Sequence, residues 1–281
     1  MKPELSIIIV SFNTEKLTRD CVESILKNSS GVNYEIIVVD NDSKDDSVKM
    51  LRGYQSTLSN FKLLENRENL GFAKANNQGI RAAKGKYILL LNSDTKVKPG
   101  TFRKLIDFAK STPDAGVVGP RLLNPDGSFQ ASCYNFPTIS GAIKEYWLGQ
   151  KGAYEKYSPE GTNPRTVDIT VATAFLITPQ GLKKVGLLDE RYFFYLEDFD
   201  YCRRIWKSGL KVYFLPDTEV VHYLGESGKK VADSKNQWRR LIPGSKIYHG
   251  LIKYYILFII IWLSQKWQKL LSGSRVCFKT S

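Results

Sequence analysis

Three apolar runs in the first third of the chain each end in a cluster of polar residues. Residues 5–10 lead into Ser11 and Asn13, residues 35–39 lead into Asp40, and residues 87–91 lead into Asp94. Short runs of this kind, apolar here except for Ser6 and Glu35, are typical of parallel strands buried on both faces of a sheet. The carboxyl ends of such strands open into the crevice where α/β sheets bind ligands, so the polar clusters are candidate binding residues.

The segments between these runs have helical periodicity. One apolar helix face lies between the first two runs, and a second helical pattern covers about residues 70–83. Alternating strands and helices predict an α/β fold with a largely parallel sheet. The residues of the first face are Leu17, Cys21, Val22, Ile25 and Leu26.

Three carboxylates stand at the start of a further amphipathic helix, in residues 197–200. Acids in the first turn complement the helix dipole, and Asp200 is spaced to pair with Arg203 or Arg204, so a purely structural role is one interpretation. The other interpretation is that these carboxylates perform chemistry. The helix itself is indicated by apolar spacing and a terminal glycine, at Phe199, Cys202, Ile205, Trp206 and Gly209.

Four segments together resemble the inverting family 2 glycosyltransferases with the GT-A fold. They are residues 6–13 (SIIIVSFN), 38–43 (VVDNDS), 69–79 (NLGFAKANNQG) and 91–94 (LNSD). Within that family, residues 119–130 (GPRLLNPDGSFQ), 185–193, the Glu197-Asp198 pair and residues 220–222 are most similar to bacterial rhamnosyltransferases. The similarity runs in order over roughly residues 4–228, which makes it more specific than any single motif.

The resemblance implies a Rossmann-like, mixed but mostly parallel central sheet flanked by helices. We expect a GT-A domain at residues 1–228 and a C-terminal, basic and apolar helical segment at residues 229–281. The implied activity is transfer of a sugar, most plausibly rhamnose from dTDP-rhamnose, with inversion onto a hydroxyl of a cell-surface glycan or a lipid-linked precursor. A UDP-hexose is the alternative donor.

The resemblance also implies roles for individual residues. Asp198 would be the general base, while Asp94 and His222 would bind a divalent cation beside the donor diphosphate. Oxygen ligands with one imidazole suit Mg²⁺ or Mn²⁺. Asp40 would lie near the ribose and Asn41 near the base. The other expected donor-binding residues are Ser11, Asn13, Lys74, Asn77 and Ser93.

Two positions depart from the family pattern. Asn92 replaces the first acid of a strict DxD motif, which leaves one carboxylate for the cation. Thr173 stands where the family usually has glycine, and the larger side chain is expected to crowd the floor of the donor or acceptor site.

Several of these residues also have structural interpretations. A lone histidine that ends an apolar strand, as His222 does, is often a structural residue. Residues 40–43 have the composition of a turn that caps the next helix. Residues 124–127 (NPDG) are a turn by composition, with a loop near the acceptor as a secondary possibility.

Composition narrows the class of protein. The chain of 281 residues is 42% hydrophobic, enough for one large core. Its four cysteines are scattered without CxxC pairs, which predicts neither a zinc site nor a disulfide framework. The first residues lack the pattern of a signal peptide. We therefore expect a cytoplasmic protein.

The net charge of +13 is concentrated near the C-terminus. Residues 239–281 hold eight Lys and Arg and no acid, around the ten-residue apolar run at 254–263. Ten residues are too few to span a bilayer, which takes about 20. Residues 251–271 are therefore expected to lie on the inner face of the membrane as an interfacial helix. A core helix and a short insertion remain alternatives for residues 251–263.

Two other classes of function are less consistent with these patterns. A nucleic-acid-binding protein would spread its positive charge, with aromatic residues, over the α/β core. A catalytically inactive glycan-binding relative would not need Asp94, Asp198 and His222. We expect a nucleotide-sugar donor, a glycan or lipid-linked acceptor and no nucleic acid partner.

Overall fold

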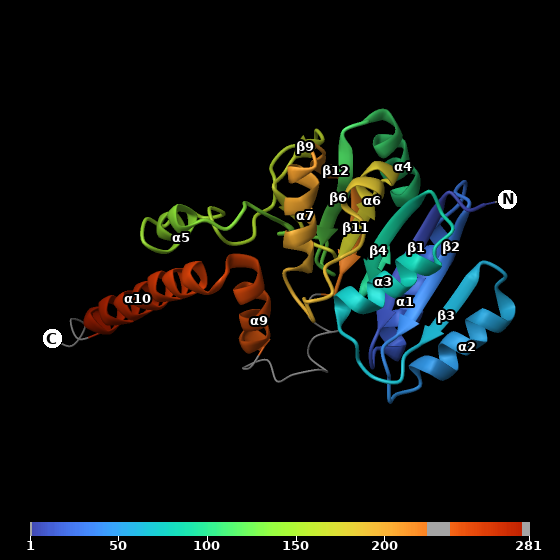
Figure 1. The fold of residues 1–281 in the computed structure, drawn as a ribbon, viewed down its shortest axis with the longest axis horizontal. Helices are drawn as coiled ribbons and strands as arrows, with labels where there is room; N and C mark the ends of the chain where they lie inside the picture. Colours follow the sequence, from blue (N-terminus) through green and yellow to red (C-terminus); the bar gives the residue numbers. More distant parts are fainter. Residues whose placement is uncertain (1, 224–236, 277–281) are drawn as a thin grey trace.

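The computed structural model describes residues 2–223 and 237–276, with the side chains of residues 2–223 and 239–271. Its centre is a mixed sheet covered by helices on both faces, with a helical arm extending to one side (Figure 1). The strands are β1 (Leu5–Ser11), β2 (Tyr34–Asp40), β3 (Phe61–Glu65), β4 (Tyr87–Asn92), β5 (Thr95–Val97), β6 (Ala115–Leu123), β7 (Phe129–Gln130), β8 (Cys133–Tyr134), β9 (Arg165–Thr166), β10 (Ile169–Thr170), β11 (Ala174–Ile177) and β12 (Lys211–His222).

The helices confirm the periodic patterns in the sequence. The expected helix near residues 70–83 is α3, and the helix that begins with three acids is α7, which ends just before Gly209. The described helices are α1 (Glu15–Asn28), α2 (Ser47–Thr57), α3 (Phe72–Ala82), α4 (Thr101–Ser111), α5 (Ile139–Tyr146), α6 (Pro179–Val185), α7 (Glu197–Lys207), α9 (Gln237–His249) and α10 (Leu251–Val276).

The strands β3, β2, β1 and β4 are parallel neighbours in that order. The register pairs Ser11 with Asp40 and Val10 with Asn92, so the polar clusters that follow the three apolar runs meet at one edge. The expected parallel arrangement is therefore confirmed for this half of the sheet.

The other half of the sheet is mixed. Strand β11 is antiparallel to both β4 and β6, and β12 continues the sheet parallel to β6. The short strand β5 pairs antiparallel with the end of β12. Only Ser93 and Asp94 separate β4 from β5, and each residue spans only a few ångströms, so β5 must lie close to the end of β4. Because β5 pairs with the end of β12, the row of strands bends so that β12 ends near β4.

The apolar strands supply two buried layers because alternate side chains point to opposite faces. Ile7, Ile9 and Leu89 belong to the layer that packs with α1, α2 and α4. Ile8 and Leu90 belong to the layer that packs with α3 and α7. Burial on both faces explains why these strands are largely apolar in the sequence.

The segment before α7 is held in an unusual backbone conformation. Tyr195 and Leu196 are consecutive left-handed residues, with φ of 73° and 72°. Just upstream, the carbonyl of Phe193 accepts a hydrogen bond from the backbone of Phe72 at 2.7 Å. A Cβ on Gly71 would lie 2.4 Å from that carbonyl oxygen, so this approach requires glycine. These contacts fix the entry of α7 against the start of α3.

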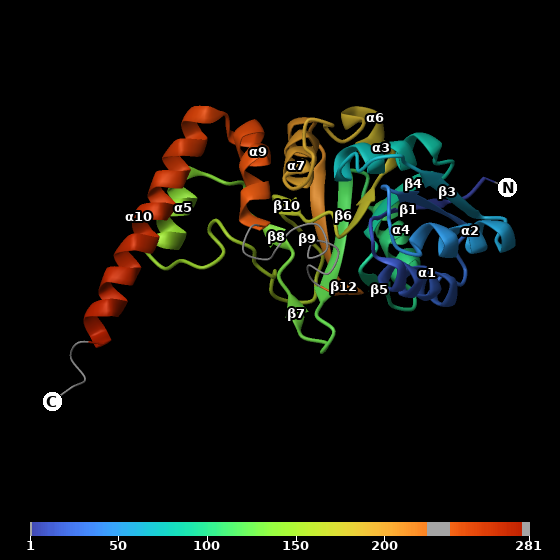
Figure 2. The ribbon, with the colours of Figure 1, turned by 90° about the horizontal axis from the view of Figure 1, so that it is seen from below.

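The helices α5, α9 and α10 form the part of the molecule that we call the arm (Figures 1 and 2). Helix α9 packs near α7, Gly250 turns the chain with φ of 72°, and α10 then runs alongside α5. Ser264 donates to the carbonyl of Tyr146 at 2.6 Å, and Trp147 donates to the carbonyl of Ile260 at 3.1 Å. The expected domain boundary between residues 228 and 229 lies outside the described residues.

Helix α10 is not a core helix, which was one alternative for residues 251–263. Within the described side chains of α10, Leu257 and Ser264 are buried, but most apolar residues are exposed. Ile252, for example, is 81% exposed. The exposed apolar residues of α10 are Leu251, Ile252, Tyr255, Ile256, Phe258, Ile259, Trp262, Leu263, Trp267, Leu270 and Leu271.

Candidate active site

Asp94 and His222 come together because of how the sheet bends. The pairing of β5 with β12 sets His222 opposite Thr95, and the backbone of Tyr223 donates to the carbonyl of Asp94 at 2.9 Å. As a result, His222 Nε2 lies 3.4 Å from Asp94 Oδ1, and both residues are buried. The sequence prediction that these two distant residues share a site agrees with this placement.

The pair has the chemistry expected of a site for a small divalent cation. An imidazole nitrogen faces a carboxylate oxygen, and both are ligands of Mg²⁺ or Mn²⁺. The described residues include no group of three or more His, Cys, Asp or Glu arranged to hold a metal. Mg²⁺ is commonly bound by one or two carboxylates together with water and substrate phosphates, so a two-residue donor set fits this type of site.

Asp198 lies in the first turn of α7, directly after the left-handed segment. Its Oδ2 accepts a hydrogen bond from the backbone of Ala172 at 3.1 Å, and its Oδ1 accepts one from the backbone of Phe199 at 2.9 Å. Burial raises the pKa of Asp198 above its ordinary value, and the two backbone donors oppose that rise. A carboxylate with a raised pKa is a stronger base than an ordinary one.

Glu197 is the second carboxylate at this helix start. It is buried, and within the described part of the chain its Oε2 has no hydrogen-bond partner. Burial, followed by the charge of Asp198, raises the pKa of Glu197 well above its ordinary value. Two adjacent buried carboxyl groups do not readily both ionise, so Glu197 is the member of the pair that favours the protonated form.

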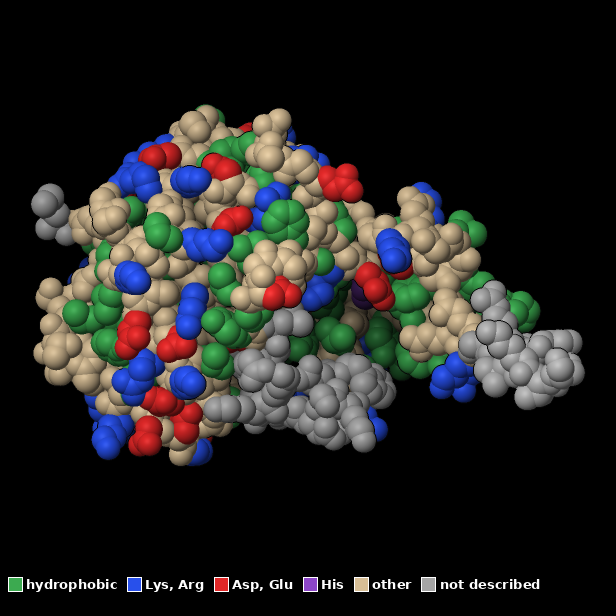
Figure 3. Space-filling model, turned by 180° about the vertical axis from the view of Figure 1, so that it is seen from behind, with side chains coloured by type: hydrophobic (Ala, Val, Ile, Leu, Met, Phe, Trp, Pro, Cys, Tyr) green, Lys and Arg blue, Asp and Glu red, His purple; other side chains and the backbone are tan. Residues whose placement is uncertain are grey.

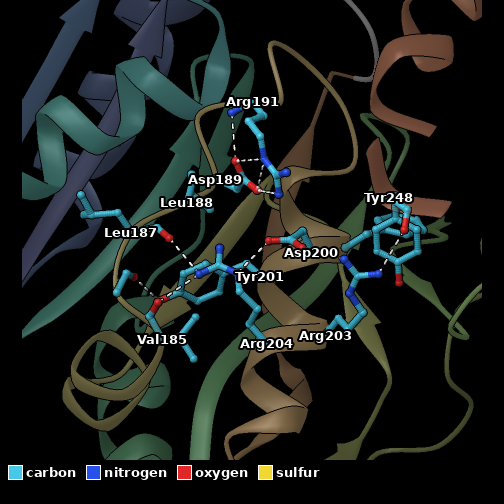
Figure 4. A network of polar contacts seen from close by, with 12 residues as sticks. Val185, Leu187, Leu188, Asp189, Arg191, Asp200, Tyr201, Arg203, Arg204 and Tyr248 are labelled. Carbon is cyan, nitrogen blue, oxygen red and sulfur yellow. Dashed lines mark hydrogen bonds and ion pairs between the residues drawn. The ribbon is translucent and has the colours of Figure 1, made fainter. Parts of the chain in front are cut away.

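Asp200 has a different role from its two neighbours. It pairs with Arg203 at 2.8 Å and with Arg204 at 2.7 Å, and Arg204 also donates to the carbonyls of Val185 and Leu187 (Figure 4). The structural interpretation of the acidic cluster is therefore confirmed for Asp200, which joins both candidate arginines. Its oxygens are occupied in this network rather than facing the cavity that contains Asp198.

A cavity of about 350 Å³ contains the candidate catalytic groups. Asp94, His222, Glu197 and Asp198 all line it. Its wall also includes Thr173, so the departure from the family pattern at that position lies on the site surface as expected. The remaining lining residues are Phe72, Asn92, Leu122, Gln130, Ala131, Tyr134, Lys156, Val171, Ala172, Phe194, Tyr195, Leu196, Phe199 and Leu241.

A second, smaller cavity of about 90 Å³ adjoins the first one. Phe72, Asn92 and Phe194 line both cavities. The smaller cavity is lined by the expected donor-binding residues Asn41 and Ser93, as well as by Val10, Phe12, Asn69, Gly71, Phe193 and Arg240. Its apolar and amide lining at the ends of β1 and β2 is suited to a nucleobase.

The side chain of Asn41 organises the loop beside this smaller cavity. Its Oδ1 accepts hydrogen bonds from the backbone of Leu70 at 3.1 Å and from Asn66 at 3.0 Å. Its Nδ2 donates to Asn69 at 2.9 Å. Asn41 therefore shapes the loop at residues 66–71 as well as lining the cavity.

Asp40, Ser11 and Asn13 lie at the same edge of the sheet but do not line the two cavities. Asp40 accepts hydrogen bonds from the backbone and hydroxyl of Ser43 at 2.9 and 2.6 Å, which forms the turn offered as its structural interpretation, but α2 begins only at Ser47, so this turn does not cap the next helix. Ser43 also accepts from the backbone of Asn13 at 2.9 Å. Burial raises the pKa of Asp40 above its ordinary value. The ribose role of Asp40 stays a prediction.

Lys74 and Asn77 are placed apart from the other expected donor-binding residues. Lys74 is exposed on α3 and lines neither cavity. Asn77 is fully buried, accepts from the backbone of Leu188 at 3.0 Å, and donates to Leu188 and Glu190. These bonds attach α3 to the segment before α7, so the structure gives Asn77 a positioning function in the fold.

Sequence analysis missed two contributors to the site. Gln130 binds the ring of His222, and the helix α9 contributes Leu241 to the larger cavity and Arg240 to the smaller one. Gln130 follows the NPDG turn, and the turn itself was the available signal. Nothing in the pattern of residues 237–249 indicates that this helix reaches the cavities.

Sequence comparisons assign the chain to a family and identify similar enzymes. Residues 6–174 match the family described as glycosyl transferase family 2. The chain is 28% identical over 211 residues to an N-acetylglucosaminyl-diphospho-decaprenol L-rhamnosyltransferase of Mycobacterium tuberculosis, covering 68% of this chain and 67% of that protein. It is 25% identical over 234 residues to the dTDP-rhamnosyl transferase RfbF of Shigella flexneri, covering 82% and 73%.

Solved structures show the same architecture at lower identity. A mannosyltransferase from Pyrobaculum calidifontis, in complex with GDP-Man and Mn²⁺, superposes with a TM-score of 0.61 at 18% identity, covering 94% of this chain and 70% of that one. GalNAc-T7, with UDP, GalNAc and Mn²⁺, gives 0.63 at 18% identity, covering 79% and 44%. These likenesses establish the GT-A fold. With the match over most of the α/β core, this chain is a member of glycosyl transferase family 2.

Proposed function

We propose that the protein transfers rhamnose from dTDP-rhamnose, with inversion, onto a hydroxyl of a cell-surface glycan or lipid-linked precursor. Two similar proteins are named as rhamnosyltransferases, one for a diphospho-decaprenol acceptor and one for a dTDP-rhamnose donor. This supports rhamnose over the alternative donor, a UDP-hexose. The acceptor is a glycan, and its lipid carrier holds it at the membrane.

One observation carries the proposal. A single cavity is lined by a buried carboxylate with a raised pKa, Asp198, and by the Asp94–His222 pair. Direct displacement at a sugar carbon needs a base for the attacking hydroxyl and stabilisation of the departing diphosphate. A non-catalytic glycan-binding protein has no need of these groups in one cavity.

Asp198 acts as the general base. As the acceptor oxygen attacks the anomeric carbon, its proton passes to an oxygen of Asp198, and the electrons of the breaking bond leave with the nucleoside diphosphate. Attack opposite the leaving group inverts the anomeric centre. The backbone donors from Ala172 and Phe199 hold the carboxylate in place during proton transfer.

Asp94 and His222 are proposed to hold a Mg²⁺ or Mn²⁺ ion beside the diphosphate. When bound, such an ion offsets the negative charge that develops on the leaving group. The protein contributes the pair itself, which the β5–β12 ladder orients, and the neighbouring smaller cavity for the nucleoside. Asn41 and Ser93 are proposed to bind the nucleoside there, with Asp40 near the ribose.

We also propose that the arm rests on the inner, cytoplasmic face of the cell membrane. Among the described helices, none combines the length with the apolar character needed to cross a bilayer. The arm exposes apolar residues on α10 and on α5, where Leu148, just beyond the helix, is 72% exposed. Residues 237–276 include Lys and Arg but no acid, so anionic headgroups complement this surface. Seen from behind, the arm carries hydrophobic side chains beside basic ones (Figure 3).

Nucleic acid is not a proposed partner. On the face of the α/β domain in Figure 3, basic and acidic side chains are interspersed rather than gathered into one basic stripe. A nucleic-acid-binding surface concentrates Lys and Arg over the path of the phosphates.

The proposal is tested by a transfer assay with the purified protein, Mn²⁺ and a lipid-linked glycan acceptor. We expect transfer from dTDP-rhamnose, none or little from UDP-hexoses, an inverted linkage by NMR, and no transfer in EDTA. A thermal-shift panel should select the same nucleotide, since a ligand at a hundred times its Kd stabilises by about 2.7 kcal/mol. Transfer only from a UDP-hexose would overturn the donor assignment, and full activity in EDTA would overturn the cation assignment.

A further inference from the structure

Gln130 contacts the Nδ1 edge of the His222 ring, inside the candidate active site. It belongs to β7, which follows the NPDG turn and pairs with β6 so that Gln130 stands opposite Leu122. Strand β12 lies on the other side of β6 and ends at His222. Gln130 Oε1 is 2.6 Å from His222 Nδ1, and both residues are buried. A buried amide that contacts a candidate cation ligand requires an explanation.

The orientation of the Gln130 amide is fixed by its other contacts. Its Nε2 donates to the backbone carbonyl of His222 at 3.2 Å and to Asn124 Oδ1 at 2.8 Å. A backbone carbonyl can only accept, so the NH₂ group must face it, and the amide oxygen must face the ring. The side chain of Asn124 is itself held by a donation to Ser128 at 2.9 Å, within the same turn.

The amide oxygen determines which ring nitrogen of His222 carries the hydrogen. An amide oxygen is an acceptor, so Nδ1 must be the donor in this contact. In the neutral ring, Nε2 then carries the lone pair, and that atom faces Asp94 Oδ1 at 3.4 Å. His222 Nε2 and Asp94 Oδ1 then face each other as two lone-pair donors, and a cation bound by both atoms stabilises this arrangement.

We propose that Gln130 is a positioning residue that locks His222 in the tautomer able to bind the cation. Without the Gln130 oxygen, the ring is free to place its hydrogen on Nε2 and donate it to Asp94, which closes the site. Residues that hold a metal-ligating histidine in this way commonly change metal affinity about 10- to 100-fold when removed. This inference rests on the proposed cation site, and it adds a function for the turn at residues 124–130.

The tautomer can be measured in the wild-type protein without any substitution. The chain has two histidines, His222 and His249, so ¹⁵N-histidine labelling gives few signals, and His222→Ala assigns them. With the ring in its neutral form, we expect the ¹⁵N shifts of His222 to show a hydrogen on Nδ1 and a lone pair on Nε2. A hydrogen on Nε2 instead would overturn the proposal.

Cation binding then separates a positioning role from a general structural one. Free Mn²⁺ is measured by EPR in the presence of dTDP, for wild type, Gln130→Leu, His222→Ala and the double variant. We expect Gln130→Leu to weaken Mn²⁺ binding about 10- to 100-fold and to have no further effect once His222 is absent. Equal losses in both backgrounds would overturn the proposal.

A matched variant in the same turn keeps the test informative if Gln130→Leu folds poorly. Asn124→Ala removes one partner of the Gln130 NH₂ group but keeps the amide oxygen and the donation to the His222 carbonyl, so we expect its Mn²⁺ affinity and its tautomer to stay close to those of wild type. A loss in Asn124→Ala as large as that in Gln130→Leu would overturn the proposal. Failure of the cation site itself has a different signature, because wild type would then bind no Mn²⁺ whatever residue stands at position 130.

Discussion

Arg203 on α7 holds Tyr248 on α9 by two contacts at once. Its guanidinium donates to the backbone carbonyl of Tyr248 at 3.1 Å and lies 4.1 Å from the centre of the tyrosine ring. Tyr248 is buried, so α9 is attached to the α/β domain, while α10 begins only after Gly250. We therefore expect that the exposed surface of α10 can be changed without disturbing Asp198, the proposed base on α7.

The first prediction concerns that surface. Replacing Ile259 and Trp262 together with Glu should abolish sedimentation with anionic vesicles, because both side chains are about half exposed and the change removes apolar area and adds repulsion. Wild type should bind strongly at low salt and only partly dissociate at high salt, since screening leaves the apolar contribution. Leu26→Glu on α1, far from the arm, is the control. Unchanged sedimentation of the double variant would exclude the arm as the membrane-binding surface.

The second prediction concerns the base. Asp198→Asn keeps the shape of the side chain but cannot take a proton, so transfer should fall by about two to four orders of magnitude. Donor affinity, measured by calorimetry with dTDP and Mn²⁺, should change little. Near-normal turnover would move the base elsewhere, with Glu197 the neighbouring carboxylate in the cavity.

The third prediction concerns the cation pair. Asp94→Ala and His222→Ala should each weaken Mn²⁺-dependent binding of the donor nucleotide, because each removes one of the two protein ligands in the described site. Nucleotide binding without Mn²⁺ should be nearly the same in both variants and wild type. Calorimetry with and without Mn²⁺ checks this. Tight Mn²⁺-dependent binding in both variants would contradict the assignment.

The fourth prediction concerns pH and Glu197. The pKa of Glu197 is raised in the folded state, so ionisation of its carboxyl group opposes folding. The folded state therefore keeps its full stability at low pH, and the free energy of unfolding falls as pH rises through the folded-state pKa of Glu197. Glu197→Gln should therefore be more stable than wild type at pH 8, and the advantage should shrink at pH 5. Urea unfolding at both pH values measures the difference. An advantage independent of pH would mean that Glu197 is not protonated preferentially by the fold.

The fifth prediction separates Asp200 from Asp198. Asp200→Ala leaves two arginines without their shared acid, and breaking buried pairs typically costs about 3–5 kcal/mol. Both guanidinium groups are about one third exposed, so we expect a smaller loss than this range, about 2–3 kcal/mol, in urea unfolding. Asp198→Asn should cost less stability and far more activity. The reverse pattern would exchange their roles.

The sequence predicted those elements whose pattern is set by local chemistry. Runs such as residues 87–91 are apolar throughout because both faces of the strand are covered, and α7 has its acids, apolar face and glycine stop in order. Strand β5 could not be predicted, because three residues after Asp94 become a strand only by pairing with β12. The arm was predicted only in part, since the contact of α10 with α5 depends on residues far apart in the chain.

The sequence indicated candidate site residues by their type, but not the contacts that these residues make. The resemblance indicated Asp94, Asp198 and His222, and the structure places all three on one cavity. The resemblance could not indicate Gln130, because the proposed function of Gln130 depends on the hairpin that pairs β7 with β6 and brings its side chain to the ring of His222. Asn77 illustrates the opposite case, because it lies within the recognised segment 69–79 but its side chain hydrogen-bonds to the backbone of Leu188.

The bent row of strands has a consequence for how the chain folds. Strands β1 to β4 come from consecutive segments and can pair as soon as residues up to 92 are available. Strand β5 follows at once, but it must wait for the end of β12, more than a hundred residues later along the chain. Contacts of such long sequence separation form slowly and late. The pairing of β5 with β12 is therefore expected to be among the last contacts of the fold to form. A ribosome-bound chain that stops short of His222 would have strands β1 to β4 in place but would lack the Asp94–His222 pair.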